Sequence, residues 1–153
     1  MAKIVADGKG AVFGRVASFV AKELLKGNSV ELINCESILV SGNVKVFADK
    51  ILQKRAMGAG SSLKGPTYPR QADRLVKRMI RGMLPWDRPK GRTAYKRLRC
   101  YVADGGLAAP NGVPPAANEG GKDLKDVKVF DHQKPMKYST IKDVVRIIKN
   151  ERA

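Results

Sequence analysis

A short apolar run followed by a glycine-bearing turn and a helical pattern opens this chain, and this unit constrains the fold most strongly. Lys3 to Asp7 (KIVAD) has the length and composition of a buried strand. Apolar residues then recur at helical spacing over about residues 12–26, and Gly27 stands where a left-handed cap is expected. The sequence therefore predicts a strand, turn and helix in that order.

The same alternation continues in the next 30 residues. Residues 30–34 (VELIN) and 38–41 (ILVS) are brief apolar runs that fit strands better than helices. A second helical pattern runs from about residue 42 to 57. Its expected buried positions are Val46, Ile51 and Leu52. Strands that alternate with helices predict an α/β domain with a largely parallel sheet and right-handed connections.

Basic residues are concentrated in the stretch from residue 70 to 99. This stretch holds eleven lysines and arginines but only two acidic residues, Asp73 and Asp87. Its net charge of +9 is more than half of the chain's +16. A sequence pI near 10.2 favours a polyanionic partner.

The segment from Ala72 to Met83 places these charges on one side of a predicted helix. Its apolar residues follow the i, i+3, i+4 spacing, and they are Ala72, Leu75, Val76, Met79, Ile80 and Met83. Its basic residues repeat that spacing on the opposite side, and they are Arg74, Lys77, Arg78 and Arg81. Like charges on one helix face repel by a few tenths of a kcal/mol per pair. Phosphates would relieve this repulsion, so nucleic acid is a better interpretation than a merely solvated face.

The helix should end at Gly82, with Met83 making the apolar contact of a glycine cap and Pro85 preventing continuation. A further helix is expected to begin near Arg92 or Thr93, and residues 100–103 could form a strand. Residues 127–130 are expected to add an edge strand. Thr140, with Asp143 three residues later, resembles the capping box of a last helix. Its apolar side should dock on the domain, through Ile141, Val144, Val145 and Ile148.

Two stretches without apolar period interrupt these elements. Residues 58–71 form an irregular basic loop with Lys64 and Arg70, which we expect to contact RNA. Residues 104–123 form a Gly/Pro-rich excursion that we expect to need a partner for its order. The whole chain, residues 1–153, suits one domain that is large enough for a hydrophobic core.

Other classes of protein find little support in the composition. No stretch approaches the roughly 20 apolar residues of a spanning helix, so we expect a soluble, intracellular protein with no membrane partner. Cys35, Cys100 and His132 are the only cysteines and histidine, which offers neither a disulfide framework nor zinc-ligand spacing. We expect no metal, no cofactor, no small-molecule substrate and no catalytic thiol.

The turn DGKGAVFG, residues 7–14, is similar to a dinucleotide-binding fingerprint and keeps a nucleotide-binding, Rossmann-like enzyme as an alternative. Phe13 occupies the place where that fingerprint needs a small residue. Glu31 and Glu36 lie near the expected distance for a ribose-binding carboxylate. The simpler interpretation is a tight turn in which Gly14 permits close packing.

The basic stretch predicts recognition of the nucleic-acid backbone. Aromatic residues are 6% of the chain, fewer than readers of single-stranded bases normally use. The predicted basic helix offers arginine and lysine without the asparagine and glutamine that read base edges. Folded RNA fits best, and a DNA-binding architectural protein remains as a second alternative.

Three segments of the chain resemble the universal large-subunit ribosomal protein family numbered thirteen, in its archaeal or eukaryotic form. They are DGKGAVFGRVASFVAKELLKG, VELINCESILVSG and RMIRGMLPWDRPKGRTAYKRLRCY. The resemblance covers roughly residues 3–103, and RGMLP at residues 81–85 is its most specific part. It implies a three-layer α/β/α domain on a four-stranded parallel sheet that binds large-subunit ribosomal RNA without catalysis.

The resemblance also implies a place in the cytoplasm, in the ribosome, beside neighbouring large-subunit ribosomal proteins. We carry nothing over for residues 104–137, where the long Gly/Pro-rich stretch departs from the family. The matched basic positions, together with the two basic residues of the loop, are the expected RNA-binding residues. These are Arg15, Lys64, Arg70, Arg74, Lys77, Arg78, Arg81, Arg88, Lys90, Arg92, Lys96, Arg97 and Arg99.

Overall fold

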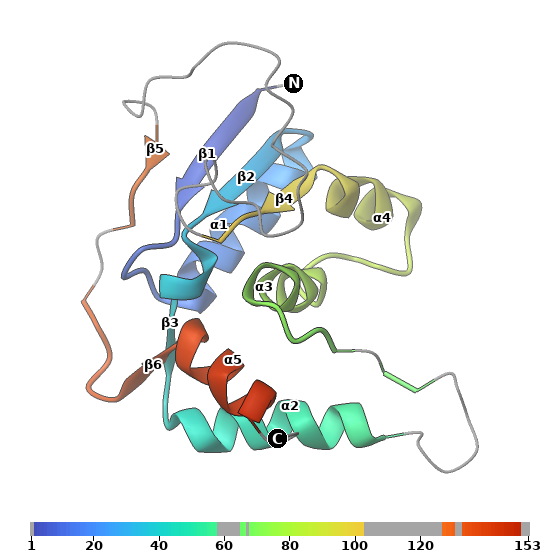
Figure 1. The fold of residues 1–153 in the computed structure, drawn as a ribbon. Helices are drawn as coiled ribbons and strands as arrows, with labels where there is room; N and C mark the ends of the chain where they lie inside the picture. Colours follow the sequence, from blue (N-terminus) through green and yellow to red (C-terminus); the bar gives the residue numbers. More distant parts are fainter. Residues whose placement is uncertain (1, 58–64, 67, 103–126, 131–132, 151–153) are drawn as a thin grey trace.

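A four-stranded parallel sheet combines two N-terminal strands with two strands from later in the chain (Figure 1). The computed structural model describes residues 2–57, 65–66, 68–102, 127–130 and 133–150. The strand order is β4-β2-β1-β5, and every pairing within this sheet is parallel. Its strands are β1 (Lys3–Asp7), β2 (Ser29–Ile33), β4 (Leu98–Cys100) and β5 (Val127–Lys128). The expected parallel sheet and the expected edge strand are confirmed.

Helix α1 (Phe13–Lys26) connects β1 to β2 and presents an apolar face to the core. Val16, Val20 and Leu24 on this face are almost completely buried. Gly27 ends the helix in the left-handed conformation, with φ of +104°, and its amide donates to Leu24 O at 3.2 Å. The predicted strand, turn and helix are confirmed, including the glycine cap.

The predicted strand at residues 38–41 forms, but it lies outside the parallel sheet. Strand β3 (Leu39–Ser41) follows a short 3-10 helix, η1 (Cys35–Ser37), and pairs antiparallel with β6 (Tyr138–Thr140). Strand β6 was not predicted from the sequence. The pairing joins segments about 100 residues apart, so no local pattern could reveal it.

Helices α2 (Val44–Ala56) and α5 (Ile141–Asn150) lie side by side near this antiparallel pair (Figure 1). In α2, Ala48 and Ile51 are buried, whereas Val46 is 52% exposed. The prediction that Val46 is buried was therefore wrong. At 3.6 residues per turn, a residue two positions from Ala48 points to the opposite side of the helix.

The start of α5 confirms the predicted capping box. The Thr140 amide donates to Asp143 Oδ2 at 3.3 Å, and the Asp143 amide donates to Thr140 Oγ1 at 3.2 Å. The apolar side of the helix docks on the domain as expected. Its buried residues are Ile141, Val144, Val145 and Ile148.

Helix α3 (Ala72–Arg81) and helix α4 (Pro89–Lys96) differ from the predictions at their ends. Helix α3 ends at Gly82 as predicted, but Gly82 is right-handed, with φ of −65°, and Met83 is 42% exposed, so the predicted left-handed cap with its apolar contact was wrong. Leu84 is the buried residue that anchors this turn. Helix α4 begins at Pro89, earlier than predicted, because proline is well suited to the first helical position.

One hydrophobic cluster joins residues of all five helices and both sheets. The predicted class, a single α/β domain on a mostly parallel sheet with a C-terminal helix, is confirmed. Among the described residues, no helix is long and apolar enough to cross a membrane. Lys64, with most of the predicted basic loop, and the whole of residues 104–123 lie outside the described residues.

Candidate nucleic-acid interface

Helix α3 separates apolar from basic side chains, and this separation builds the candidate interface. Leu75, Val76 and Ile80 are completely buried beneath the helix, close to β4. Arg74 on the other side is exposed. Lys77, Arg78 and Arg81 are half-buried. The predicted helical wheel is thus correct within α3, although Met83 lies beyond the helix and is exposed, and three of the four cations are partly covered.

Aromatic rings provide this cover. The Arg81 guanidinium lies 3.8 Å from the centre of the Trp86 ring, and Lys77 Nζ lies 5.1 Å from that of Tyr95. Trp86 and Tyr95 also contact each other edge to face, with centres 5.2 Å apart. Such cation–π contacts contribute about 0.5–1 kcal/mol at exposed sites. They hold the cations of α3 against α4 and the preceding turn, so α3, the turn and α4 form one surface.

A third aromatic ring braces the other side of α3. Arg78 Cζ lies 5.2 Å from the centre of the Tyr68 ring, and Lys54 Nζ from α2 lies 5.6 Å from it. Sequence reasoning identified the arginine but missed Lys54 and the role of the rings. A signal was available, because the only tryptophan and three of the four tyrosines fall within residues 68–101.

A close backbone contact places α4 beside the turn that carries Trp86. A Cβ atom on Gly91 would collide with the carbonyl group of Pro85, so only glycine fits this position. The exposed cations of this region lie on the residue that precedes α4 and on α4 itself. They are Arg88, Lys90, Arg92 and Lys96.

Two predicted RNA-binding arginines are engaged by the fold. Arg92 Nε donates to Trp86 O at 3.0 Å, while its Nη2 donates to Asp87 O at 3.4 Å. Arg97 is half-buried, and its Nη2 donates to Leu24 O at the last turn of α1, at 3.0 Å. Arg92 remains exposed and able to reach a ligand, whereas Arg97 connects two helices.

The remaining predicted cations lie at different distances from this surface. Arg99 is exposed on β4, next to α3, and Arg70 is half-buried just before that helix. Arg15 is exposed in the first turn of α1, at the other end from Leu24. The structure therefore brings the cations of α3, α4 and β4 together, while Arg15 stands apart.

No carboxylate neutralises this basic surface within the described residues. Both of the salt bridges found there lie elsewhere, joining Lys3 to Glu31 and Lys26 to Glu23. Unpaired cations on adjacent elements repel one another, and a polyanion relieves that repulsion. The arrangement suits the phosphates of a nucleic acid.

The sequence has clear relatives among known proteins. The family model described as ribosomal protein L13 matches residues 2–105. A protein of Methanopyrus kandleri is 45% identical over 98 residues, which is 64% of this chain and 60% of that protein. One of Archaeoglobus fulgidus is 33% identical over 147 residues, 94% of this chain and 86% of that protein. A third, of Methanocaldococcus jannaschii, is 38% identical over 104 residues, 65% of this chain and 74% of that protein.

The three archaeal proteins are each named large ribosomal subunit protein uL13. The chain belongs to the ribosomal protein L13 family. The predicted family and its archaeal character are thereby confirmed. The L13 family is structural and not enzymatic, and the family match covers the whole basic stretch of residues 70–99.

The glycine-rich turn of this L13-family chain is filled by its own residues. A Cβ on Gly8 would lie 2.6 Å from Ile38 and 3.0 Å from Ile33 O, and Gly10 has φ of +67°. Gly14, by contrast, faces open space, so the expectation that it permits close packing was wrong. Gly8 is the glycine that permits a close approach, because without a side chain it packs against Ile33 of β2 and against Ile38 after η1.

The carboxylate and thiol candidates also have structural explanations. Glu31 is paired with Lys3 across β1 and β2, with the ammonium and carboxylate 3.0 Å apart. A hydrogen bond with Cys100, together with burial, raises the pKa of the Cys35 thiol well above its ordinary value. A protonated, buried thiol is a poor nucleophile. Both observations agree with the non-enzymatic character of the L13 family.

Proposed function

We propose that this chain is a structural component of the large ribosomal subunit, located in the cytoplasm, and that it binds ribosomal RNA through α3, α4 and the turn between them. The coarser role follows from the family and from the printed names of the relatives. RNA contact is our inference from the surface itself. Neighbouring large-subunit proteins are the other partners that a ribosomal place implies.

The proposal rests on the basic surface of α3, the following turn and α4, where aromatic rings hold several of the cations. Arg81 and Lys77 lie on Trp86 and Tyr95, and no carboxylate pairs with them within the described residues. Lysine and arginine lose up to about 2 kcal/mol of side-chain freedom when they are fixed. Cations already held by rings lose less on binding, so phosphates are gripped at a smaller entropic cost.

RNA binding at increasing salt tests the proposal. If about 6 to 10 phosphates are contacted, affinity for large-subunit ribosomal RNA should fall by about 10³ to 10⁵ between roughly 50 and 200 mM salt. The measurement is filter binding of the full chain with transcribed RNA. A duplex DNA of equal length serves as the comparison, and equal affinity for both would favour an architectural DNA-binding protein.

Sedimentation supplies an independent check in the cell. The tagged chain should travel with large ribosomal subunits in a sucrose gradient and leave that fraction after a high-salt wash. Sedimentation with chromosomal DNA, or free migration at low salt, would contradict the proposal.

A further inference from the structure

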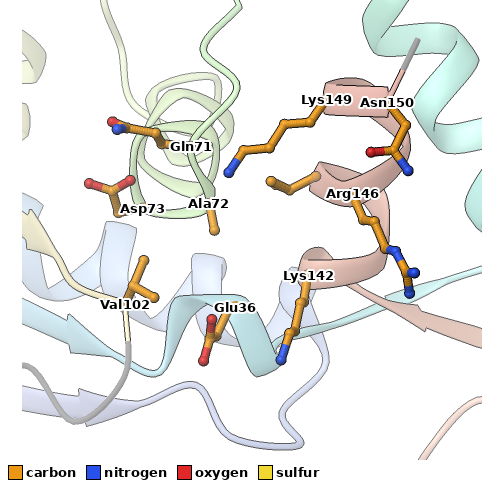
Figure 2. Close-up of a pocket in the computed structure, with 10 residues that line it drawn as sticks. Glu36, Gln71, Ala72, Asp73, Val102, Lys142, Arg146, Lys149 and Asn150 are labelled. Carbon is orange, nitrogen blue, oxygen red and sulfur yellow. The ribbon is translucent and has the colours of Figure 1, made fainter. Parts of the chain in front are cut away.

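A cleft of about 470 Å³ opens between the first turn of α3, helix α5 and the 3-10 helix η1 (Figure 2). Ala72, Val102 and Val145 give it an apolar lining. Its volume falls within the range of about 300–1,000 Å³ that small-molecule pockets occupy. The cleft is separate from the aromatic rings that brace α3.

One wall of the cleft is positively charged. Lys142, Arg146 and Lys149 line it from α5, at positions i, i+4 and i+7 on one side of the helix. All three are exposed, and none takes part in a salt bridge within the described part of the chain. In Figure 2, Lys149 extends from α5 across the opening toward Ala72.

The facing wall is the start of α3. Its first helical hydrogen bond runs from the Leu75 amide to Gln71 O at 2.8 Å, so the preceding amides have no partner within the helix. Gln71 provides no side-chain cap, and its Oε1 atom is buried with no hydrogen-bond partner among the described residues. The unpaired Oε1 atom is an acceptor and suits an amino group of a ligand, and Asp73 already brings negative charge to this first turn. An anion is therefore better placed beside Lys149 and the other cations of α5.

Two carboxylates complete the lining and narrow the choice of ligand. Glu36 and Asp73 lie across the cleft from α5. They would repel an acidic peptide, but carboxylates accept hydrogen bonds from the amino groups of nucleobases. A nucleotide suits the cleft, because its phosphate matches the cations of α5 and its amino-bearing base matches the two carboxylates.

We propose that the cleft receives one nucleotide of the bound RNA. Its phosphate lies beside the cations of α5, and its base covers the apolar lining with its edge toward Glu36 and Asp73. The proposal rests on the proposed RNA-binding function. It extends the interface to the start of α3, where Asp73 of the cleft directly precedes Arg74, the first cation of the basic face.

A matched pair of triple variants tests this assignment. Lys142→Gln, Arg146→Gln and Lys149→Gln remove three charges from the cleft, and the control Lys22→Gln, Lys45→Gln and Lys50→Gln removes three exposed charges that do not line it. The cleft variant should bind ribosomal RNA about tenfold less tightly than the control. Its salt slope should be smaller by about 0.7 to 1.4, equivalent to one or two phosphates. Equal affinities for the two variants would overturn the proposal.

Lysine acetylation with a succinimidyl ester separates failure of this proposal from failure of the proposed function. Bound RNA should protect Lys142 and Lys149 as well as Lys90 and Lys96 of α4, while Lys22 stays reactive. Protection of Lys90 and Lys96 alone would overturn the cleft assignment and leave RNA binding by α4 intact. Protection of none would overturn the proposed function itself. Protection of Lys142 and Lys149 by polyglutamate but not by RNA would identify a peptide site and overturn the nucleotide.

Discussion

Helices α3 and α5 are alike in length and pattern but differ in how they hold their cations. Both have ten residues, an apolar stripe buried in the core and cations on the remaining surface. In α3, Arg78, Arg81 and Lys77 lie on aromatic rings. In α5, Lys142 and Lys149 border a cleft with no ring contact within the described residues. We therefore expect the two helices to contribute unequally to RNA affinity despite similar charge, because fixed side chains lose less freedom on binding.

The largest expected effect comes from reversing charge on each helix in turn. Lys77→Glu with Arg78→Glu should weaken RNA binding by about 100-fold or more, since each lost charge-assisted hydrogen bond contributes about 1.5–3 kcal/mol. Lys142→Glu with Arg146→Glu makes the same charge change on α5 and should weaken it by roughly tenfold. Filter binding at fixed salt gives both numbers. A larger effect on α5 would show that the rings give α3 no advantage.

The next effect concerns the ring beneath Arg81. Trp86→Ala should lower the free energy of unfolding by about 2 kcal/mol, less than for a fully buried aromatic, because Trp86 is half-buried. RNA affinity should fall several-fold as Arg81 loses its support. Denaturant unfolding and filter binding measure the two losses, and Trp86→Phe should recover most of each. If only stability fell, the ring would serve the fold and not the interface.

The starts of the two helices provide a smaller contrast. Thr140→Ala removes the capping box of α5 and should lower unfolding free energy by about 1 kcal/mol. Gln71→Ala in α3, where the side chain makes no capping hydrogen bond, should have a clearly smaller effect. Thermal unfolding compares them, with Thr140→Ser as the control that keeps the hydroxyl. A loss for Thr140→Ala as small as the loss for Gln71→Ala would mean that the capping box of α5 contributes little to the free energy of unfolding.

The smallest effect is a change of titration in Tyr95. Burial raises the pKa of this phenol above its ordinary value, and the positive charge of Arg81 opposes that rise. Arg81→Gln should therefore raise the pKa of Tyr95 further, as followed by ultraviolet absorbance during alkaline titration. The stability linked to the neutral phenol is present below the unfolded-state pKa and is lost as pH rises through the folded-state pKa. An unchanged pKa would show that Arg81 does not influence the phenol.

Local patterns in the sequence predicted the elements whose cause is itself local. The helical spacing of Leu75, Val76 and Ile80 gave α3, and Thr140 with Asp143 gave the start of α5. These predictions were correct because apolar periodicity and capping depend on residues within one or two turns. The resemblance to the L13 family rested on the segments 7–27, 30–42 and 78–101.

Features that depend on distant contacts could not be read in this way. Strand β6 exists through its pairing with β3, and the cleft exists because α5 returns to the start of α3. Val46 belongs to an apolar pattern too weak to fix which side of α2 faces the core. The RNA-binding prediction named cations that the structure brings together on α3 and α4, but it could not separate the cations held by rings from Arg97.

The hydrogen bond from Arg97 to Leu24 O connects residues 73 positions apart. It joins the end of α4 to the last turn of α1, and the two helices also pack against each other. The position of the cations on α4 therefore depends on a helix that carries none of the α3 and α4 surface. A substitution that loosens the last turn of α1 would displace those cations without touching any of them.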